Sequence, residues 1–500
     1  MRKSTKLVTL VAALVAICSL TAVAAGWVNE GGTWYYLDKD GDYVTSAWKA
    51  DGANYYWLDE DGAMATNQLV EDGDKLYYVG GDGARVTGGW VAVEADDADA
   101  DLGVDHRWYY FQANGKAYKD KTVTIGENKY HFDEDGKMVF GFVDEKCEII
   151  NDYEDLPLRA SYYYGDNDNG AMQIGWLQWT DGFTTTDKYD GLSEIWFYFD
   201  GTTKSASKRG LKLAGVEKKI NGQHYLFDED GVMLSEWQNS TVSTGAAAAS
   251  TSKYYSSDVD GHKVKSQWIY KVPSEDVCPD DYDDETERWF YVDKNGKPYA
   301  GATKKINGKY YTFDETGIMK SGLVLMKGED ASLTSPTNFT FVEKAGSLTA
   351  QKIMDSEYTA FYFSGDEKAD GSMKTGTYKI EVDDGEYTFT FDKHGRAITG
   401  KNGNKLYING LLLDAGDDRY KVVEYTKDDE YKGFYLVSST GTIIKSGKYV
   451  KDANDDYYAT FEAEDGQHCV KILDCDDAAK AAKAFAKDGT EPAVKFIKMY

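Results

Sequence analysis

Short stretches of alternating apolar and polar residues run along this chain, and they come in pairs separated by glycine-containing turns. The first pair occupies residues 27–28 and 34–37, with Asn, Glu and two Gly residues between them at 29–32. Tyr, Trp and Val favour pleated strands, whereas Gly, Asn and Asp favour tight turns. This pattern predicts a β-hairpin in which Trp34 and Tyr36 lie on one face and Tyr35 lies on the other.

The hairpin pattern repeats with a period of roughly 20 residues, which is typical of repeat architectures. The most regular copies are WVNEGGTWYYLDKDGDYVT at 27–45, WKADGANYYWLDEDGAMAT at 48–66 and LVEDGDKLYYVGGDGARVT at 69–87. Because a single two-stranded hairpin is only marginally stable in water, each copy must stack on its neighbours to bury its apolar side. The sequence therefore predicts an all-β fold, a β-solenoid of stacked β-hairpin repeats, with a short C-terminal helix.

Changes in the repeats divide the chain into five predicted segments. They are a secretory signal peptide at 1–25, short-loop hairpin repeats at 26–89, hairpin repeats with long acidic inserts at 90–322, diverged Trp-free hairpin repeats at 323–475, and a capping helix with a tail at 476–500. The signal is indicated by basic residues followed by an apolar stretch and small residues. All twelve Trp residues lie between Trp27 and Trp289, although the hairpin pattern continues beyond them. Their loss indicates that Trp has a role other than folding.

The formal net charge of −29 argues against nucleic acid and anionic lipid as partners. No apolar run after the signal reaches transmembrane length, so we expect an exported protein without a transmembrane anchor. Four cysteines follow the signal, which is too few for a disulfide scaffold in so long a chain, and their pairing stays open. Their spacing fits no zinc motif, and the acidic turns lack the EF-hand pattern, so we predict no metal site.

The sequence also predicts that the chain has no catalytic residues and no cofactor. Its six His residues are scattered, and no nucleophile elbow, HExxH motif, P-loop or Cys/His pair is present. The repeats fill nearly the whole chain after the signal, and residues 323–475 still lack a set of acid, base and nucleophile. We therefore predict a binding protein rather than an enzyme.

The motif at Trp27 to Thr45 resembles the cell-wall-binding repeats of choline-binding proteins from Gram-positive bacteria. The units NGQHYLFDEDGVM at 221–233 and NGKYYTFDETGIM at 307–319 are similar to the related glucan-binding and clostridial-toxin repeats. The resemblance implies a β-solenoid with ligand sites in grooves between consecutive hairpins. In the choline-binding branch each site is a box of aromatic side chains around a quaternary ammonium group, and in the other branches the grooves hold sugars.

A quaternary ammonium group donates no strong hydrogen bond, so its recognition depends on cation–π attraction and an apolar enclosure. Carried onto this chain, the resemblance implies that each box uses a first-strand Trp and a return-strand aromatic, with a third wall from the adjoining hairpin. The predicted ligand-binding pairs are Trp27 with Trp34, Trp48 with Tyr55, Trp90 with Trp108, Trp176 with Trp196, and Trp268 with Trp289. In the third unit Leu69 and Leu76 stand at both positions, so a box there would be incomplete.

We therefore expect a secreted, non-enzymatic surface protein of a Gram-positive bacterium, held non-covalently on the cell wall. Its expected partner is choline-bearing teichoic acid or a similar wall polysaccharide, with host glycans as a further partner. Two alternatives remain open. One is a carbohydrate- or glucan-binding adhesin of the toxin-repeat type, in which Tyr and Phe stack on sugar rings. The other is a structural spacer without a small ligand, in which all the aromatics serve packing.

Overall fold

The computed structural model describes residues 24–499, apart from the segments 151–155, 181–186, 190–193, 203–207, 240–242, 329–334, 345–348, 366–369, 428–431, 464–466 and 474–495. The predicted signal peptide, up to residue 23, lies outside the described residues. So do the predicted C-terminal helix and Cys475, and of the segment 476–500 only 496–499 are described. The chain divides into two compact units, Met1–Glu217 with Phe227–Met233, and Lys218–Leu226 with Leu234–Tyr500.

The first unit begins with three compact hairpins, each a two-stranded antiparallel sheet with a two-residue turn. Their strands are β1 (Gly26–Glu30), β2 (Thr33–Leu37), β3 (Ala47–Asp51), β4 (Asn54–Leu58), β5 (Gln68–Asp72) and β6 (Lys75–Val79). In the first hairpin the turn is Gly31-Gly32, and both glycines have positive φ, at 64° and 97°. Side chains with a Cβ adopt this backbone at a cost, which explains why Gly occupies the turn.

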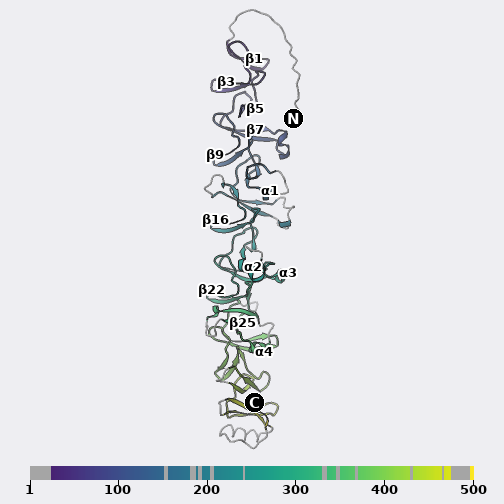
Figure 1. Ribbon diagram of the computed structural model, residues 1–500, viewed down its shortest axis with the longest axis vertical. Coiled ribbons are helices and arrows are strands. Elements are labelled where there is room, and N and C mark those ends of the chain that lie inside the picture. The colour runs from purple at the N-terminus through teal and green to yellow at the C-terminus, as the bar shows by residue number, and fades with distance from the viewer. Residues whose placement is uncertain are drawn as a thin grey trace, which may run out of the picture. The chain divides into compact units, whose positions relative to one another are not determined.

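Longer hairpins follow, and several carry short helices in the inserts between their strands (Figure 1). These elements are β7 (Gly89–Glu94), η1 (Asp97–Leu102), β8 (His106–Phe111), β9 (Lys121–Ile125), β10 (Asn128–Phe132), β11 (Gly141–Val143), α1 (Leu156–Arg159), β12 (Tyr162–Tyr164), β13 (Gly175–Trp179), η2 (Asp187–Tyr189), β14 (Ile195–Asp200), β15 (Leu211–Lys212), β16 (Val216–Ile220) and β17 (Gln223–Phe227). In Figure 1 the hairpins that hold β1, β3, β5 and β7 follow one another along the first unit.

β16 and β17 each lie partly in both units, and the second unit continues with hairpins and then with wider sheets. Its elements are β18 (Glu236–Gln238), α2 (Gly245–Thr251), β19 (Lys253–Tyr255), β20 (Gln267–Lys271), α3 (Pro279–Asp283), β21 (Arg288–Val292), β22 (Ala302–Ile306), β23 (Lys309–Phe313), β24 (Met319–Lys320), β25 (Gly322–Gly328), η4 (Pro336–Asn338), β26 (Phe339–Lys344), α4 (Ala350–Asp355), β27 (Thr359–Phe363), β28 (Gly376–Val382), β29 (Gly385–Phe391), β30 (Gly400–Asn402), β31 (Lys405–Ile408), β32 (Leu411–Leu412), β33 (Tyr420–Tyr425), β34 (Gly433–Ser438), β35 (Tyr449–Lys451), β36 (Tyr457–Glu462), β37 (His468–Leu473) and β38 (Phe496–Met499).

Three-stranded sheets form at β13-β14-β15, β22-β23-β24 and β26-β25-β27, and from β28 onward the sheets have five or more strands, which the repeat pattern does not indicate. One sheet has the order β28-β29-β32-β31-β30, and another has β33-β34-β37-β36-β35, with β38 paired to β37. The β34–β37 pair is parallel, whereas the hairpins are antiparallel. Leu, Ile and Val fill the buried positions here, as in the cluster of Leu406, Tyr425 and Val437. The fold is mostly β and rich in hairpins as predicted, but it also has short helices within the inserts.

An Asp residue directly after many of the strands organises the turn that follows. Its carboxylate oxygen Oδ1 accepts hydrogen bonds from the backbone N–H groups two and four residues later, as Asp59 does from Asp61 (3.0 Å) and Ala63 (2.8 Å). The same pair of bonds forms at Asp38, Asp133, Asp144, Asp228, Asp293, Asp314, Asp392 and Asp452. The repeated D-x-D-G sequence is thus a turn motif, consistent with the preference of Asp for such turns.

Consecutive hairpins pack face to face, and the alternation of side chains along the return strand decides which residues meet. Trp27 lies opposite Tyr36 in the strand register, and Tyr56 of the next hairpin packs against Trp27. Likewise Trp48 and Trp57 of the second hairpin pack against the buried cluster that holds Tyr77 and Val79 of the third. Each of these hairpins therefore presents one aromatic face to its successor.

Candidate functional site

Three of the predicted Trp pairs form matching right-angled corners. The ring centroids of Trp90 and Trp108 are 6.4 Å apart with their planes at 87°. Those of Trp176 and Trp196 are 6.4 Å apart at 84°, and those of Trp268 and Trp289 are 6.2 Å apart at 87°. In each case the first Trp lies directly opposite a return-strand Tyr, and the second Trp lies two residues before that Tyr on the same face. Strand pairing therefore places the two indoles side by side.

A third aromatic wall comes from the next hairpin in the chain. Tyr130 lies 4.9 Å from Trp90 at an interplanar angle of 68°, and Tyr311 lies 4.8 Å from Trp268 at 69°. The sequence indicated a third wall from the adjoining hairpin but did not identify its residue. The signal was nevertheless present, because alternation along a strand puts the residue after the cage position on the face that meets the preceding hairpin.

In the first hairpin, Trp27 makes the corresponding contacts with two Tyr rings. Trp27 meets Tyr36 at 5.4 Å and Tyr56 of the next hairpin at 5.3 Å, with planes at 90° and 76°. Trp34 lies on the same face and is 44% exposed, so its ring is open to solvent. The Trp289 ring is also 44% exposed, whereas the other predicted Trp residues are half-buried. The predicted Trp residues are therefore accessible from solvent and not enclosed between sheets.

A methionine of the next repeat bonds to the backbone of three of these return-strand Trp residues, and sequence reasoning missed it. The backbone N–H of Met64 donates to the carbonyl oxygen of Trp34 (2.8 Å). Met138 and Met233 make the same bond to Trp108 (2.7 Å) and Trp196 (2.9 Å). Met319, in the corresponding sequence position, packs in the cluster that includes Trp268. The recurring Gly-x-Met in the sequence is the signal that would have identified this position.

The second predicted pair, Trp48 with Tyr55, has a different occupant at that position. Arg85 stands where the units of Trp34, Trp108 and Trp196 have Met, and its backbone N–H donates to the carbonyl oxygen of Tyr55 (2.8 Å). The Arg85 guanidinium carbon lies 4.4 Å from the Tyr55 ring, 5.3 Å from Trp48 and 5.5 Å from Tyr77. The Arg85 guanidinium, a cation of the chain itself, therefore lies near three rings: the predicted pair Trp48 and Tyr55, and Tyr77 of the next hairpin.

The third unit carries Leu at both cage positions, as the sequence indicated, and the space there is filled. Leu76 is only 5% exposed and packs with Tyr109 and Phe111 of the next hairpin. The corresponding aromatic residues Trp34 and Tyr55 are 44% and 43% exposed. Leu76 is thus buried between the hairpins, whereas the aromatic residues at the same position are partly exposed to solvent.

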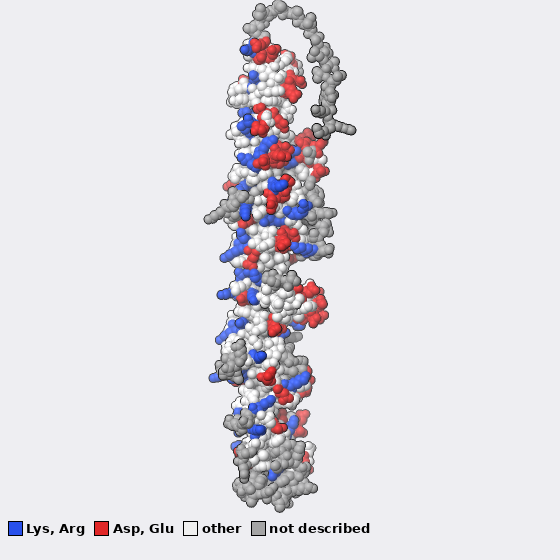
Figure 2. All heavy atoms as spheres, in the orientation of Figure 1, with Lys and Arg blue, Asp and Glu red and all other residues white. Residues whose placement is uncertain are grey.

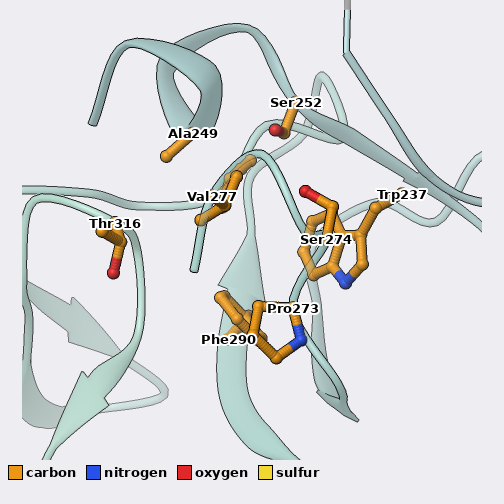
Figure 3. A pocket seen from close by; sticks show the side chains of 9 residues that line it. Trp237, Ala249, Ser252, Pro273, Ser274, Val277, Phe290 and Thr316 are labelled. Atoms are coloured by element: carbon orange, nitrogen blue, oxygen red, sulfur yellow. The ribbon is translucent and has the colours of Figure 1, made fainter. Parts of the chain in front are cut away.

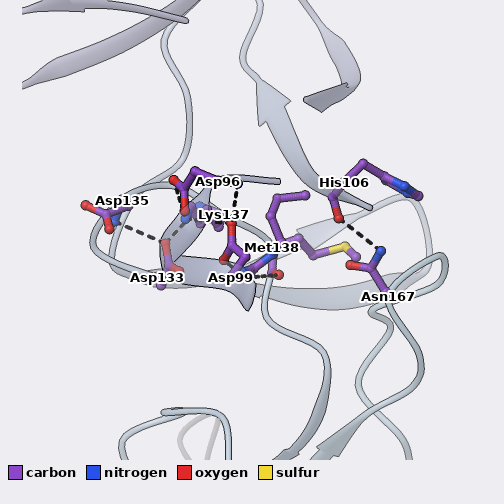
Figure 4. A network of polar contacts seen from close by, with 9 residues as sticks. Asp96, Asp99, His106, Asp133, Asp135, Lys137, Met138 and Asn167 are labelled. Atoms are coloured by element: carbon purple, nitrogen blue, oxygen red, sulfur yellow. Dashed lines mark hydrogen bonds and ion pairs between the residues drawn. The ribbon is translucent and has the colours of Figure 1, made fainter. Parts of the chain in front are cut away.

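A network of buried charges ties the η1 insert to the following turn (Figure 4). Asp99 pairs with Arg107 and accepts a 2.9 Å bond from Lys137 Nζ, which also reaches Asp96 at 3.1 Å. Arg107 donates a further bond to the carbonyl oxygen of Met138 (3.1 Å). Burial by itself would raise the pKa of Asp99, but the hydrogen bonds and charges of Lys137 and Arg107 outweigh it and leave that pKa lowered. The insert is held by these bonds next to the Trp90–Trp108 pair.

Other concave regions of the described chain do not match the predicted pairs. Under α2, Trp237, Val277 and Phe290 line a cavity of about 10 Å³, which has room for one water molecule at most (Figure 3). An open pocket of about 590 Å³ beside the charge network is lined by Arg107, His131 and Lys137 among others. Figure 2 shows acidic side chains over the projecting α3 insert, where Asp281 binds Arg288.

The described residues show little that points to other chemistry. They contain no group of three His, Cys, Asp or Glu side chains placed to hold a metal ion. Cys147 and Cys278 are free thiols, and burial raises the pKa of each. None of the described helices is long and apolar enough to cross a membrane.

Two family models match parts of this chain. The choline-binding repeat model matches residues 42–85. The putative cell wall binding repeat model matches residues 25–43, 107–117, 123–138 and 218–233. These stretches include the Trp27, Trp48 and Trp108 positions, so the matched repeats contain members of three predicted pairs.

Among curated proteins, the chain is similar to streptococcal glucosyltransferases. Glucosyltransferase-S of Streptococcus downei is 26% identical over 223 residues, which are 44% of this chain and 12% of that protein. Glucosyltransferase-I of the same organism is 23% identical over 393 residues, which are 64% of this chain and 24% of that protein. The chain thus spans a quarter or less of the length of these relatives.

Among solved structures, the chain is similar to proteins of Streptococcus pneumoniae. Choline binding protein F, determined in the presence of a peptidoglycan analogue, shares 19% identity over 79% of this chain and 100% of that chain, with a TM-score of 0.31. The modular autolysin LytC in complex with a synthetic peptidoglycan ligand shares 18% identity over 60% of this chain and 55% of that chain, with a TM-score of 0.33.

Proposed function

Because this chain carries repeats of the choline-binding and cell-wall-binding type, we propose that it attaches to a bacterial cell wall by binding choline groups of wall polymers. The observation that carries the proposal is the recurrence of one aromatic corner. Perpendicular Trp pairs lie in the hairpins of β7, β13 and β20, and Trp27 with Trp34 occupy the same positions in the hairpin of β1. We propose that these four sites bind the ligand.

The chemistry of the corner suits a quaternary ammonium group. Two indole faces at right angles and a Tyr from the next hairpin place three π-systems around one point. Such a group is held by cation–π attraction, which these rings provide without a hydrogen-bond acceptor. The Nε1 atoms of Trp27 and Trp108 are buried without a hydrogen-bond partner among the described residues, so these indoles present ring faces rather than donors to a ligand.

The wider proposal follows from the repeats. We propose a β-solenoid of stacked hairpins that is exported, carries no catalytic site and stays on the cell surface without a covalent bond. Within it, residues 26–322 hold the binding hairpins, and residues 323–475 provide a separate surface. Several weak sites on one chain gain avidity on a polymer that repeats its ligand, because each bound site raises the effective concentration at the next.

A glucose polymer is the second candidate ligand. The curated relatives are glucosyltransferases, and the similarity extends over as much as 393 residues of this chain. Aromatic side chains that stand half-exposed, such as Tyr270 beside Trp289 at 4.8 Å, also suit stacking on a sugar ring. In this alternative the same grooves hold glucose units rather than ammonium groups.

Retention on an immobilised amine separates the two candidates. The wild-type chain and a quadruple variant, with Trp34, Trp108, Trp196 and Trp289 each changed to Ala, are loaded on a choline-mimicking amine resin. We expect the wild type to stay bound until free choline is added, and the variant to flow through. The matched control changes Tyr43 and Tyr282 to Ala, which are 44% and 47% exposed but lie outside the proposed sites. We expect the control to behave as the wild type does.

The proposal fails if the quadruple variant is retained as well as the wild type while its β circular-dichroism signal is intact. Elution of the wild type by soluble glucan and not by choline would favour the second candidate. Collapse of the β signal in the variant would mean that the indoles serve packing, and would support the structural spacer.

A further inference from the structure

Arg85 occupies the second aromatic cage, which we define as Trp48, Tyr55 and Tyr77. The guanidinium carbon lies 4.4 Å from the Tyr55 ring centroid, 5.3 Å from Trp48 and 5.5 Å from Tyr77. Cation–π attraction acts at distances up to about 6 Å from a ring centroid, so all three rings attract this one cation. Trp48 and Tyr77 are themselves 5.0 Å apart at 67°, which is the corner seen between Trp90 and Tyr130.

The position of Arg85 is equivalent to that of the methionines in the proposed choline sites. In both cases the backbone N–H donates to the carbonyl oxygen of the return-strand aromatic, from Arg85 to Tyr55 (2.8 Å) and from Met64 to Trp34 (2.8 Å). Both side chains also lie over the glycine of the following turn. A Cβ on Gly115 would come within 2.6 Å of Arg85 Nε, and one on Gly83 within 2.6 Å of Met64 Cε. The two sites therefore differ in the residue type at this position.

Arg85 has no other partner that would explain its place. Its Nε atom is buried without a hydrogen-bond partner, and no carboxylate pairs with it in the part of the chain that the structure describes. Lys212, which bonds to the Ser161 carbonyl oxygen in the same way, is different. Its Nζ donates to the carbonyl oxygens of Pro157 (2.7 Å) and Leu158 (2.6 Å), and therefore has conventional acceptors. The rings are what hold the Arg85 cation.

We propose that Arg85 is a built-in ligand of the second cage, and that this cage is closed to free quaternary ammonium groups while its neighbours stay open. A second cation among the same rings would clash with the guanidinium group and would be repelled by its positive charge. The seated Arg85 instead links the second hairpin to the third. The exclusion of choline from this cage rests on the proposed function. The position of Arg85 among the three rings does not, and it has a separate test.

The test compares the full-length wild type with Arg85→Met, which places at this position the residue found in the open cages. The number of choline molecules bound per chain is measured by equilibrium dialysis at saturating choline chloride. We expect Arg85→Met to bind one more choline per chain than the wild type, and Tyr55→Ala added to it to remove that gain. Arg419→Met is the matched control, because Arg419 lies 5.5 Å from a single ring, Tyr420, and its loss opens no cage.

Two results would overturn the inference. One is an unchanged choline number in a folded Arg85→Met chain. The other is a fall in the choline number when Tyr55→Ala is made in the wild type, because the second cage would then bind choline with Arg85 present. Binding by Arg85→Met but not by the wild type would support the inference and count against the proposed function.

If no form of the chain binds choline, the proposed function fails and the seating of Arg85 is decided by thermal unfolding. We expect Arg85→Met to lower Tm by about 2 °C in the wild type, from the loss of cation–π contacts. In the Tyr55→Ala background the same change should lower Tm by less, because one of the rings is already missing. An equal Tm shift in the two backgrounds would show that Arg85 and the cage do not interact, and would overturn the inference.

Discussion

At the scale of single residues, the acidic residues and glycines of the turns stabilise the turns and are not part of the aromatic cages. The backbone N–H groups of Asp42 and Asp40 hold the pKa of Asp38 below its usual range, as expected of a carboxylate that accepts such bonds. The glycines three residues after these Asp residues have positive φ, for example 89° at Gly41 and 85° at Gly62. The high acidic content of the chain is therefore partly a consequence of its many turns.

Replacing Asp59 tests this role of the turn carboxylates. Asp59→Ala removes the acceptor of two backbone N–H groups, and we expect it to lower the free energy of unfolding by about 1–2 kcal/mol. Both bonds end on the same oxygen, Oδ1, so Asp59→Asn keeps the acceptor and should cost less than half as much. Chemical denaturation followed by Trp fluorescence measures both. Equal losses for Ala and Asn would show that charge, not the turn bonds, matters here.

Two glycine positions separate backbone strain from crowding. At Gly83 an added Cβ would come within 2.6 Å of Met64 Cε, whereas at Gly52 nothing lies within 4 Å, and both have positive φ. We expect Gly52→Ala to cost about 1 kcal/mol, from strain alone. Gly83→Ala should cost about 2–3 kcal/mol, because Met64 must also move. Thermal unfolding of the two variants measures the difference, and indistinguishable Tm values would contradict the packing of Met64 over this turn.

At the scale of elements, the inserts are attached to their hairpins by particular polar contacts rather than by apolar area. The η1 insert depends on Asp99, whose side chain is only 4% exposed and faces both Arg107 and Lys137. Removing one partner of a buried ion pair leaves the other charge without compensation, which is costly. Substitution of Asp99 should therefore detach the η1 insert from its hairpin.

Asp99→Asn is the corresponding prediction, and its effect should depend on pH. At pH 7 we expect a loss of about 3–5 kcal/mol in unfolding free energy. The pKa of Asp99 is lowered by folding, so the unfolded chain binds more protons and this stabilisation disappears as pH falls through the folded-state pKa. The difference in unfolding free energy between the wild type and Asp99→Asn should thus shrink as the pH falls below 3.8, the usual pKa of an Asp side chain.

Denaturation curves at pH 7 and in strong acid measure this dependence. Asp96→Asn is the matched control, because Asp96 contacts the same Lys137 but its side chain is 61% exposed. We expect it to cost about 0–1 kcal/mol at either pH. A pH-independent effect of Asp99→Asn would mean that shape, not charge, holds the insert.

At the scale of the whole molecule, the chain offers several similar sites for a polymeric ligand. Three Trp pairs share one perpendicular arrangement, and Trp27 with Trp34 occupy the same strand positions, but the pairs differ in exposure, so we expect unequal affinities. When sites are linked in one chain, losing one reduces the effective concentration for all the others. Attachment to a polymer should therefore depend on the number of sites more steeply than binding of free choline does.

A graded series of variants tests this dependence. Starting from Trp108→Ala, the remaining pairs are removed one at a time, and both bound choline and retention on purified cell wall are measured. We expect bound choline to fall in proportion to the intact sites. Wall retention should fall by about tenfold or more for each of the later losses. Retention that falls only in proportion to bound choline would show that the sites act independently on the wall.

Much of the fold was predictable because local pattern and turn chemistry decide it. The alternation of aromatic and polar residues placed the hairpins at 27–37, 48–58 and 69–79, and the predicted faces of Trp34 and Tyr35 agree with the strand register. The wide sheets after residue 376 were not predictable, since pairing of β34 with β37 joins segments separated by a further hairpin. Nothing in a local pattern specifies that pairing.

The sequence by itself determined which residues carry aromatic rings, where the chain turns and which hairpins lack a cage, as at Leu69 and Leu76. Only the tertiary structure decided what each cage contains. Tyr130 meets Trp90, and Arg85 enters between Trp48 and Tyr55, because stacking brings together residues from successive hairpins. The physical reason is that side-chain alternation is a property of one strand, whereas a cage needs faces from two hairpins and is filled by whatever side chain the next turn supplies.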